Sequence, residues 1–182
     1  MRANRLEDDI RNTAIGVCAG ILGTAVVAVF SAAPSDADVM REMRDRAQIE
    51  DVMWRYTRAL DSNDADAYAS VYTPDGQFSA GANATKGRDA LRKMIADLRQ
   101  RAADAQAKGE PKRPPMYHMT ANERVTFSDK DHARVEAYYL TAMAAGGENT
   151  PLRVAAVGRS NDDLVRLNGQ WLIRTRNVAP QD

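Results

Sequence analysis

Cysteine and histidine are scarce in this 182-residue chain, which contains one of the former and two of the latter. A single cysteine excludes a disulfide framework and a cysteine-rich zinc site, and two histidines are too few for a zinc site built from histidines alone. Neither familiar glycine-rich phosphate-binding pattern occurs, so nothing supports nucleotide binding. The 25 basic and 25 acidic side chains cancel, which argues against a broad basic surface for nucleic acid. We therefore expect no metal, no cofactor and no nucleic-acid partner.

Apolar residues are concentrated near the N-terminus, where residues 14–33 are almost wholly apolar and carry no charge. One interpretation is an uncleaved single-span membrane anchor, because twenty helical residues cover roughly 30 Å of hydrocarbon. Another is a signal peptide, with the small residues 31–33 as its cleavage site. A buried core helix fits less well, because the run is apolar on every face.

Charges around this run indicate its orientation. Arg2, Arg5 and Arg11 precede it, and Asp36 and Asp38 follow it, which places the N-terminus in the cytoplasm and the rest of the chain outside. We therefore interpret residues 1–34 as a signal peptide or single-span anchor and residues 35–182 as one domain. The expected location is exported or membrane-anchored, with a tether through residues 14–33 if the segment is retained.

Helical signals open the domain. Ser35 suits the N-cap of a long first helix, in which Ile49, Val52, Met53 and Tyr56 recur at helical spacing. We expect that helix to end at residues 61–64 and a second, short helix to span residues 65–72. A turn at 73–76, a short strand at 77–80 and a third helix after Gly87 follow. We expect residues 99–115 to form a frayed helix end and a basic loop.

Strand patterns fill the remainder of the chain, at residues 116–127, 133–143, 152–167 and 170–178. Asn168-Gly169 is the strongest hairpin signal, because a type I′ turn requires positive φ at both central residues. Three helices followed by an antiparallel meander predict an α+β fold with helices on one face of the sheet.

Several ordered runs resemble a known family. They are Ile49-Glu50-Asp51, Arg55-Tyr56, residues 59–64 and 71–76, Gly158-Arg159, residues 162–166 and 169–171, Arg174 and Arg176. Together they resemble SnoaL-like proteins of the nuclear transport factor 2-like superfamily, over roughly residues 45 to 178. The resemblance implies a cystatin-like α+β roll, in which a cone-shaped, curved antiparallel or mixed sheet packs against three helices. An apolar N-terminal helix would precede it here, and a pocket would enter the hollow.

The same resemblance implies a catalytic pair. In dehydratases of this superfamily, including scytalone dehydratase and the bile-acid dehydratases, an aspartate near the end of the first helix pairs with a strand histidine. Asp61 and His118 match those positions, and Tyr56 matches an associated tyrosine. The carboxylate would fix the imidazole tautomer, the imidazole would take a proton α to a carbonyl, and the tyrosine hydroxyl would hydrogen-bond the enolate.

Each of these residues also has a purely structural interpretation. Asp61 can cap a turn, His118 can be a core histidine, and Tyr56 can simply pack. The candidate substrate-binding residues are Asn122, Tyr139, Arg176 and Trp54. Asn122 shares the face of His118 if the strand is unbroken.

Two functions are therefore expected. The first is a cofactor-independent lyase or isomerase of the SnoaL-like type, acting on a small apolar carbonyl or hydroxylated ring compound. The alternative is a non-catalytic ligand-binding or assembly domain held at the outer face of the membrane. Both imply a small-molecule ligand, and the superfamily suggests a homodimer through the outer face of the sheet.

Overall fold

A computed structural model describes residues 33–144 and 151–179 of the chain. The chain divides into Met1–Ala33 and Pro34–Asp182, and the description below concerns the second unit. The expected signal peptide or anchor, the tether at residues 14–33 and the apolar N-terminal helix lie outside the described residues, apart from their last positions. None of the helices in the described part is both long and apolar enough to span a bilayer.

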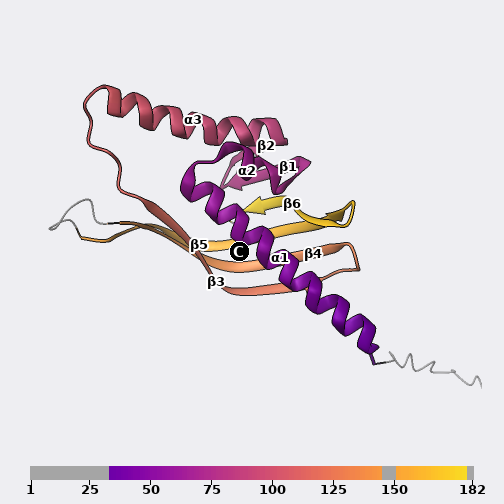
Figure 1. The fold of residues 1–182 in the computed structure, drawn as a ribbon. Helices are drawn as coiled ribbons and strands as arrows, with labels where there is room; N and C mark the ends of the chain where they lie inside the picture. The colour runs from indigo at the N-terminus through magenta and orange to yellow at the C-terminus, as the bar shows by residue number, and fades with distance from the viewer. Residues whose placement is uncertain (1–32, 145–150, 180–182) are drawn as a thin grey trace, which may run out of the picture. The chain divides into compact units, whose positions relative to one another are not determined.

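Three helices and six strands make up the described domain (Figure 1). In chain order they are α1 (Asp36–Ser62), α2 (Ala65–Ser70), β1 (Tyr72–Ala80), β2 (Asn83–Lys86), α3 (Arg88–Ala107), β3 (Met116–Phe127), β4 (His132–Met143), β5 (Arg153–Leu167) and β6 (Gln170–Asn177).

The predicted caps define the first two helices. The Ser35 side chain accepts a hydrogen bond from the backbone N–H of Asp38, which satisfies one free donor at the start of α1. The helix ends at Asn63, whose φ of 52° lies in the left-handed region. Asp64 then caps α2 by accepting from the N–H of Ala67. These local signals fix the position of the catalytic candidate Asp61, one residue before the end of α1.

A mixed sheet carries the strands in the order β2-β1-β6-β5-β4-β3. Strands β3 to β6 form the predicted antiparallel meander, β1 pairs parallel with β6, and β2 pairs antiparallel with β1. Asn168 and Gly169 join β5 to β6 with φ of 52° and 80°, as a type I′ turn requires. Because β3 is an edge strand, one side of its backbone is free to face α1.

Several elements differ from the sequence predictions. Helix α2 ends at Ser70 and not at residue 72, and β1 begins at Tyr72 and not at residue 77. Residues 73–76, predicted as a turn, lie within β1, where they form an irregularity in its pairing with β6. The Arg88 guanidinium donates to the carbonyl oxygen of Tyr72, which holds this stretch against α3. Strand β2 was not predicted, since it is short and mostly exposed. Helix α3 continues to Ala107, because the alanine-rich residues 102–107 favour helix without any buried face.

The core lies between the helices and one face of the sheet. Its largest fully buried side chains include Trp171, Tyr68, Tyr72, Ile49 and Leu91, which come from β6, α2, β1, α1 and α3. Helix α1 crosses the sheet and contacts β3 and β6, whereas α2 and α3 pack together beside β1 (Figure 1). This arrangement leaves the long side of α1 facing the edge strand β3.

Candidate active site

Asp61 and His118 lie in direct contact. The Oδ1 atom of Asp61 is 2.7 Å from the ring Nδ1 of His118 and 3.1 Å from its backbone nitrogen. The two side chains are 9% and 22% exposed, so water has limited access to the pair. The backbone N–H of His118 is free to donate because β3 has no further strand beyond it. One carboxylate oxygen thus joins the end of α1 to the edge of the sheet.

This contact sets the chemistry of the imidazole. When the Nδ1–H of His118 donates to Asp61, the lone pair of the neutral ring is left on Nε2. Such a ring accepts a proton at Nε2, and the adjacent carboxylate stabilises the imidazolium that forms. The arrangement can therefore serve as a general base, provided that a substrate reaches Nε2.

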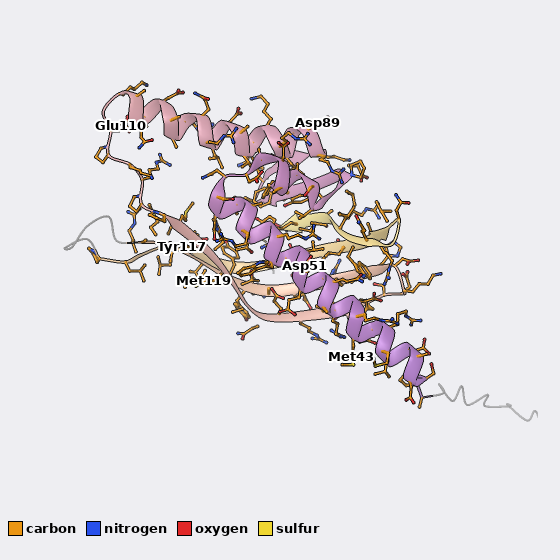
Figure 2. All side chains as sticks on the ribbon, viewed as in Figure 1. Met43, Asp51, Asp89, Glu110, Tyr117 and Met119 are labelled. Atoms are coloured by element: carbon orange, nitrogen blue, oxygen red, sulfur yellow. The ribbon has the colours of Figure 1, made fainter. Side chains whose placement is uncertain are left out.

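A cleft of about 680 Å³ between α1 and β3 provides that access. This volume suits a small organic ligand. Figure 2 shows two of its lining residues, Asp51 on α1 and Met119 on β3. The lining side chains are Ala47, Glu50, Asp51, Met53, Trp54, Thr57, His118, Met119, Thr120, Ala121, Asn122 and Glu123.

A bulge in β3 lies at Asn122, and Asn122 still lines the cleft. The pairing of β3 with β4 shifts between Ala121 and Arg124, so two residues of β3 lie opposite one residue of β4. Asn122 adopts a φ of 54° at this bulge and leaves the regular alternation that starts at His118. Glu123 takes the next inward position, and Val125 continues that face. Glu123 is therefore a cleft residue that the sequence pattern did not identify.

Charge in the cleft is predominantly negative. Glu50, Asp51 and Glu123 line it, together with His118, whereas none of the lysines and arginines within residues 33–144 and 151–179 does. Glu123 is exposed to the open cleft, yet partial loss of water around its carboxyl group and the nearby negative charge of Glu50 raise its pKa. Arg176 acts in the opposite direction and lowers it. The two glutamates therefore interact electrostatically across the cleft.

A second pair of charged side chains is buried in the sheet and does not line the cleft. Arg176 on β6 donates from Nη1 to Oδ2 of Asp162 on β5, and both side chains are buried. Burial raises the pKa of Asp162 to about 6, although the positive charge of Arg176 opposes this shift. Within the described residues, Asp162 Oδ1 and Arg176 Nε have no hydrogen-bond partner. The pair is therefore held at an energetic cost, as expected for buried ions.

Tyr56 belongs to this buried group rather than to the cleft lining. The Arg176 guanidinium carbon lies 4.4 Å from the centre of the Tyr56 ring, and Tyr56 is buried. Its ring also contacts Tyr68 and Tyr72, at centroid distances of 5.3 and 6.3 Å. The structure thus brings Tyr56 and Arg176 together, but neither is among the residues that line the cleft.

The other predicted residues are divided between the cleft and the sheet. Trp54 lines the cleft and is 64% exposed, so its ring is available to a ligand. Tyr139 is half-buried on β4, where its hydroxyl donates to the carbonyl oxygen of Val178 and its ring lies against Gly158. Among residues 33–144 and 151–179, no group of three or more His, Cys, Asp or Glu side chains could hold a metal ion.

Comparisons with known proteins agree with this fold. A protein of the nuclear transport factor 2-like class with a cystatin-like fold, from Novosphingobium aromaticivorans, is 23% identical, with a TM-score of 0.64 over 80% of this chain and 88% of that one. A candidate scytalone dehydratase from the same organism is 23% identical, with a TM-score of 0.61 over 76% and 85%. A Mycobacterium tuberculosis protein of unknown function is 22% identical, with a TM-score of 0.63 over 79% and 75%.

At these identities the structural likeness establishes the fold alone. No curated protein sequence matches the chain. The model of the SnoaL-like domain matches residues 41–177, a span that begins within α1 and ends with β6. The chain therefore belongs to the SnoaL-like domain family, with the fold of nuclear transport factor 2-like proteins.

Proposed function

We propose that this domain is a lyase or isomerase that acts on a small, largely apolar carbonyl or hydroxylated ring compound. The observation that carries the proposal is the 2.7 Å contact between Asp61 and His118 beside a cleft of about 680 Å³. A base needs a fixed tautomer, limited hydration and access to substrate, and this pair has all three.

The proposed reaction begins at the Nε2 atom of His118. Nε2 takes a proton from the carbon next to a carbonyl, and the C–H electron pair forms the enolate, while Asp61 stabilises the imidazolium. In a lyase, the enolate expels a β-hydroxyl group, which takes the proton from Nε2 and leaves as water. In an isomerase, Nε2 returns the proton to a different carbon. Neither reaction requires a further reactant, because the proton that Nε2 removes is the proton that it later delivers.

Other side chains have supporting roles in the proposal. The exposed face of Trp54 and the side chains of Met53 and Met119 provide apolar contact for the substrate. Thr120 follows His118 on the same strand face and offers a hydroxyl to the enolate oxygen. Tyr56 and Arg176 lie behind the cleft, and movement of either into the cleft would be needed for direct contact with substrate. Fold similarity to a candidate scytalone dehydratase supports this reaction class by analogy.

A non-catalytic ligand-binding domain is the second candidate. The open cleft and the 64% exposed Trp54 favour ligand binding whether or not turnover follows. Attachment to the outer face of a membrane rests on the sequence of residues 1–34 and stays a prediction, as does the homodimer. Turnover separates the two candidates, because a binding domain retains the ligand unchanged.

The test is exchange and elimination in deuterated water with a panel of β-hydroxy ketones and cyclic enones, followed by NMR. We expect His118→Asn to abolish deuterium incorporation that the wild type catalyses. His132→Asn is the matched control, because His132 Nδ1 also contacts an aspartate, Asp129, at 3.0 Å, but in an exposed turn. Equal exchange by wild type and His118→Asn would remove the proposed base.

A further inference from the structure

The outer side of α1 carries a second apolar stripe, opposite the side that packs on the sheet. Met40, Met43 and Trp54 are 55%, 60% and 64% exposed, and with the exposed Ala47 they recur at spacings of three, four and seven residues. The fully buried Ile49 lies two residues from Ala47, or about 200° around the helix. In Figure 1, α2 and α3 are grouped near the C-terminal end of α1, so the stripe stays open along most of the helix.

The charges outside the core form four blocks along this helix. Their net charges are −2, +2, −2 and +2, because the second block contains three arginines and one glutamate. Reversing the helix about Ala47 therefore exchanges each block with one of opposite sign. The blocks are the pair Asp36 and Asp38, residues 41–46 without the buried Asp45, the pair Glu50 and Asp51, and the pair Arg55 and Arg58.

We propose that α1 pairs with α1 of a second copy of this chain, in antiparallel orientation, with the two-fold axis beside Ala47. A residue after Ala47 then lies opposite the residue equally far before it in the second copy, so acidic blocks meet basic blocks. Parallel pairing would set each block against itself. The small side chain of Ala47 lets the two helices approach closely, and Met40 of each copy contacts Trp54 of the other.

Arg44 and Asp51 provide a specific ion pair in this arrangement. They are seven residues apart and therefore share one edge of the stripe, three residues before and four residues after Ala47. Across the two-fold axis, Arg44 of each copy meets Asp51 of the other. Within the described part of the chain Arg44 forms no ion pair, whereas Asp51 contacts Arg55 at 2.8 Å on an exposed surface.

The charge pattern favours a second copy over the N-terminal segment of the same chain. Residues 12–35 contain no charged side chain, so they could cover the stripe without complementing its charges. The stripe from Met40 to Trp54 is about 21 Å long at about 1.5 Å per residue, which is short for a stable interface. We therefore expect a weak dimer, with a dissociation constant of roughly tens of micromolar, that added salt weakens further.

Such a dimer would narrow the cleft without covering the catalytic candidate Asp61. Ala47 and Trp54 also line the cleft, so the second helix would lie along its open side. Helix α1 of the second copy begins at Asp36, opposite Arg58, and Asp61 lies beyond that point. The pairing is compatible with the proposed function and does not depend on it.

Disulfide cross-linking of the full-length chain in mild detergent tests the pairing, with Cys18→Ser as the background. Ala47→Cys should give a covalent dimer on mild oxidation, because residue 47 of both copies lies beside the axis. Gln48→Cys is the matched control, since its exposed side chain points about 100° away. Met40→Cys mixed with Trp54→Cys should also cross-link, whereas neither alone should. Equal cross-linking of Ala47→Cys and Gln48→Cys, or a dimer that Ala47→Cys does not capture, overturns the assignment.

Charge reversal tests the ion pair, with dissociation measured by analytical ultracentrifugation at low salt. Arg44→Glu and Asp51→Arg should each weaken the dimer about tenfold, because each sets like charges against each other twice. An equimolar mixture of these two variants should recover the wild-type affinity, because every facing pair is again of opposite sign. Arg99→Glu, the same charge change at an exposed site on α3, is the control and should dimerise as the wild type does.

Circular dichroism checks that each of these variants folds. Equal weakening by Arg44→Glu and Arg99→Glu, or a mixture no tighter than the single variants, would contradict antiparallel pairing through α1.

Discussion

Asp61 holds His118 at two points, because the same Oδ1 atom lies within hydrogen-bonding distance of the ring Nδ1 and of the backbone nitrogen. The backbone contact fixes the edge of β3 against α1, and the ring contact fixes the orientation of the imidazole. A single carboxylate therefore both closes the end of the cleft and prepares the proposed base. Replacing Asp61 should affect the chemistry more strongly than the fold.

The variant Asp61→Asn tests this dual role. An asparagine oxygen can still accept from both the backbone N–H and the ring Nδ1–H of His118, but the neutral amide cannot stabilise the imidazolium that forms during proton transfer. We expect proton exchange to fall by about a hundredfold or more, with a normal circular dichroism spectrum. Ser62→Ala, one residue further along α1, is the control and should exchange as the wild type does. A normal rate in Asp61→Asn would separate the carboxylate from catalysis.

The interaction between Glu50 and Glu123 makes a prediction about titration. The pKa of Glu123 is raised by partial loss of water and then by the charge of Glu50, so Glu50→Gln should lower it toward the ordinary value. NMR titration of the Glu123 side-chain carboxyl carbon measures this directly. Asp51→Asn should leave the Glu123 titration nearly unchanged. An unaltered midpoint in Glu50→Gln would show that the two carboxylates do not face each other.

The raised pKa of Asp162 leads us to expect that this residue makes the protein less stable as the pH rises. Burial raises its pKa from 3.8 to about 6, so between these values the folded protein binds this proton more tightly than the unfolded chain does. Its contribution to the free energy of unfolding is therefore present below pH 3.8 and is lost as the pH rises through about 6, by on the order of 3 kcal/mol.

Urea unfolding of wild type and Asp162→Asn at several pH values measures this contribution. The stability of the wild type relative to the variant should decrease as the pH rises through that window, because asparagine does not titrate. Asp129→Asn is a control of opposite sign, since hydrogen bonding to the Asp131 backbone and His132 side chain lowers the pKa of Asp129. If the free energy of unfolding of the wild type, relative to that of Asp162→Asn, rose with pH, the raised pKa of Asp162 would be contradicted.

Asp45 is expected to stabilise the fold rather than the site. It is buried, accepts from Trp171 Nε1 at 3.3 Å, and lies 2.5 Å from the Arg166 guanidinium. Asp45→Ala removes the acceptor of Trp171 Nε1 and one of two carboxylates beside Arg166, whose other carboxylate, Asp131, lies at 3.5 Å. The change should cost about 2 to 3 kcal/mol, less than for a fully buried pair because the Arg166 side chain is partly exposed.

Exposed Asp51, paired with Arg55 on the same helix, provides the comparison for Asp45. Asp51→Ala should cost less than about 0.5 kcal/mol. The free energy of unfolding in urea distinguishes the two variants. A cost for Asp45→Ala no greater than that for Asp51→Ala would show that the Asp45 contacts do not stabilise α1 on the sheet.

Local sequence patterns were sufficient to predict most of the helices and strands. The cystatin-like roll was predicted from the family resemblance. Ser35, Asp64 and Asn168-Gly169 carry their signals within a few residues, because caps and tight turns depend on short-range hydrogen bonds and φ preferences. Strand β2 and the course of residues 73–76 were missed. Residues 73–76 pair irregularly with β6, which is distant in sequence, so no local pattern encodes their course. Strand β2 pairs with the neighbouring β1, but it is too short and too exposed to show a strand pattern.

The candidate site, like the fold, could be predicted from the sequence only in part. The residue types and order of Tyr56, Asp61 and His118 suggested a proton-transfer pair, but their identification needed the family resemblance. That Tyr56 stacks under Arg176, away from the cleft lining, follows only from side-chain packing.

By itself, the sequence determined the caps that begin α1 and α2, the meander, the balanced charge and the supply of one acid and one imidazole for the proposed chemistry. Tertiary structure alone decided that Glu123 enters the cleft, because the bulge that reverses the alternation of β3 is a property of its pairing with β4. It also decided that Asp61 meets His118, because the contacts between α1 and the edge strand β3 join residues that are far apart in the chain.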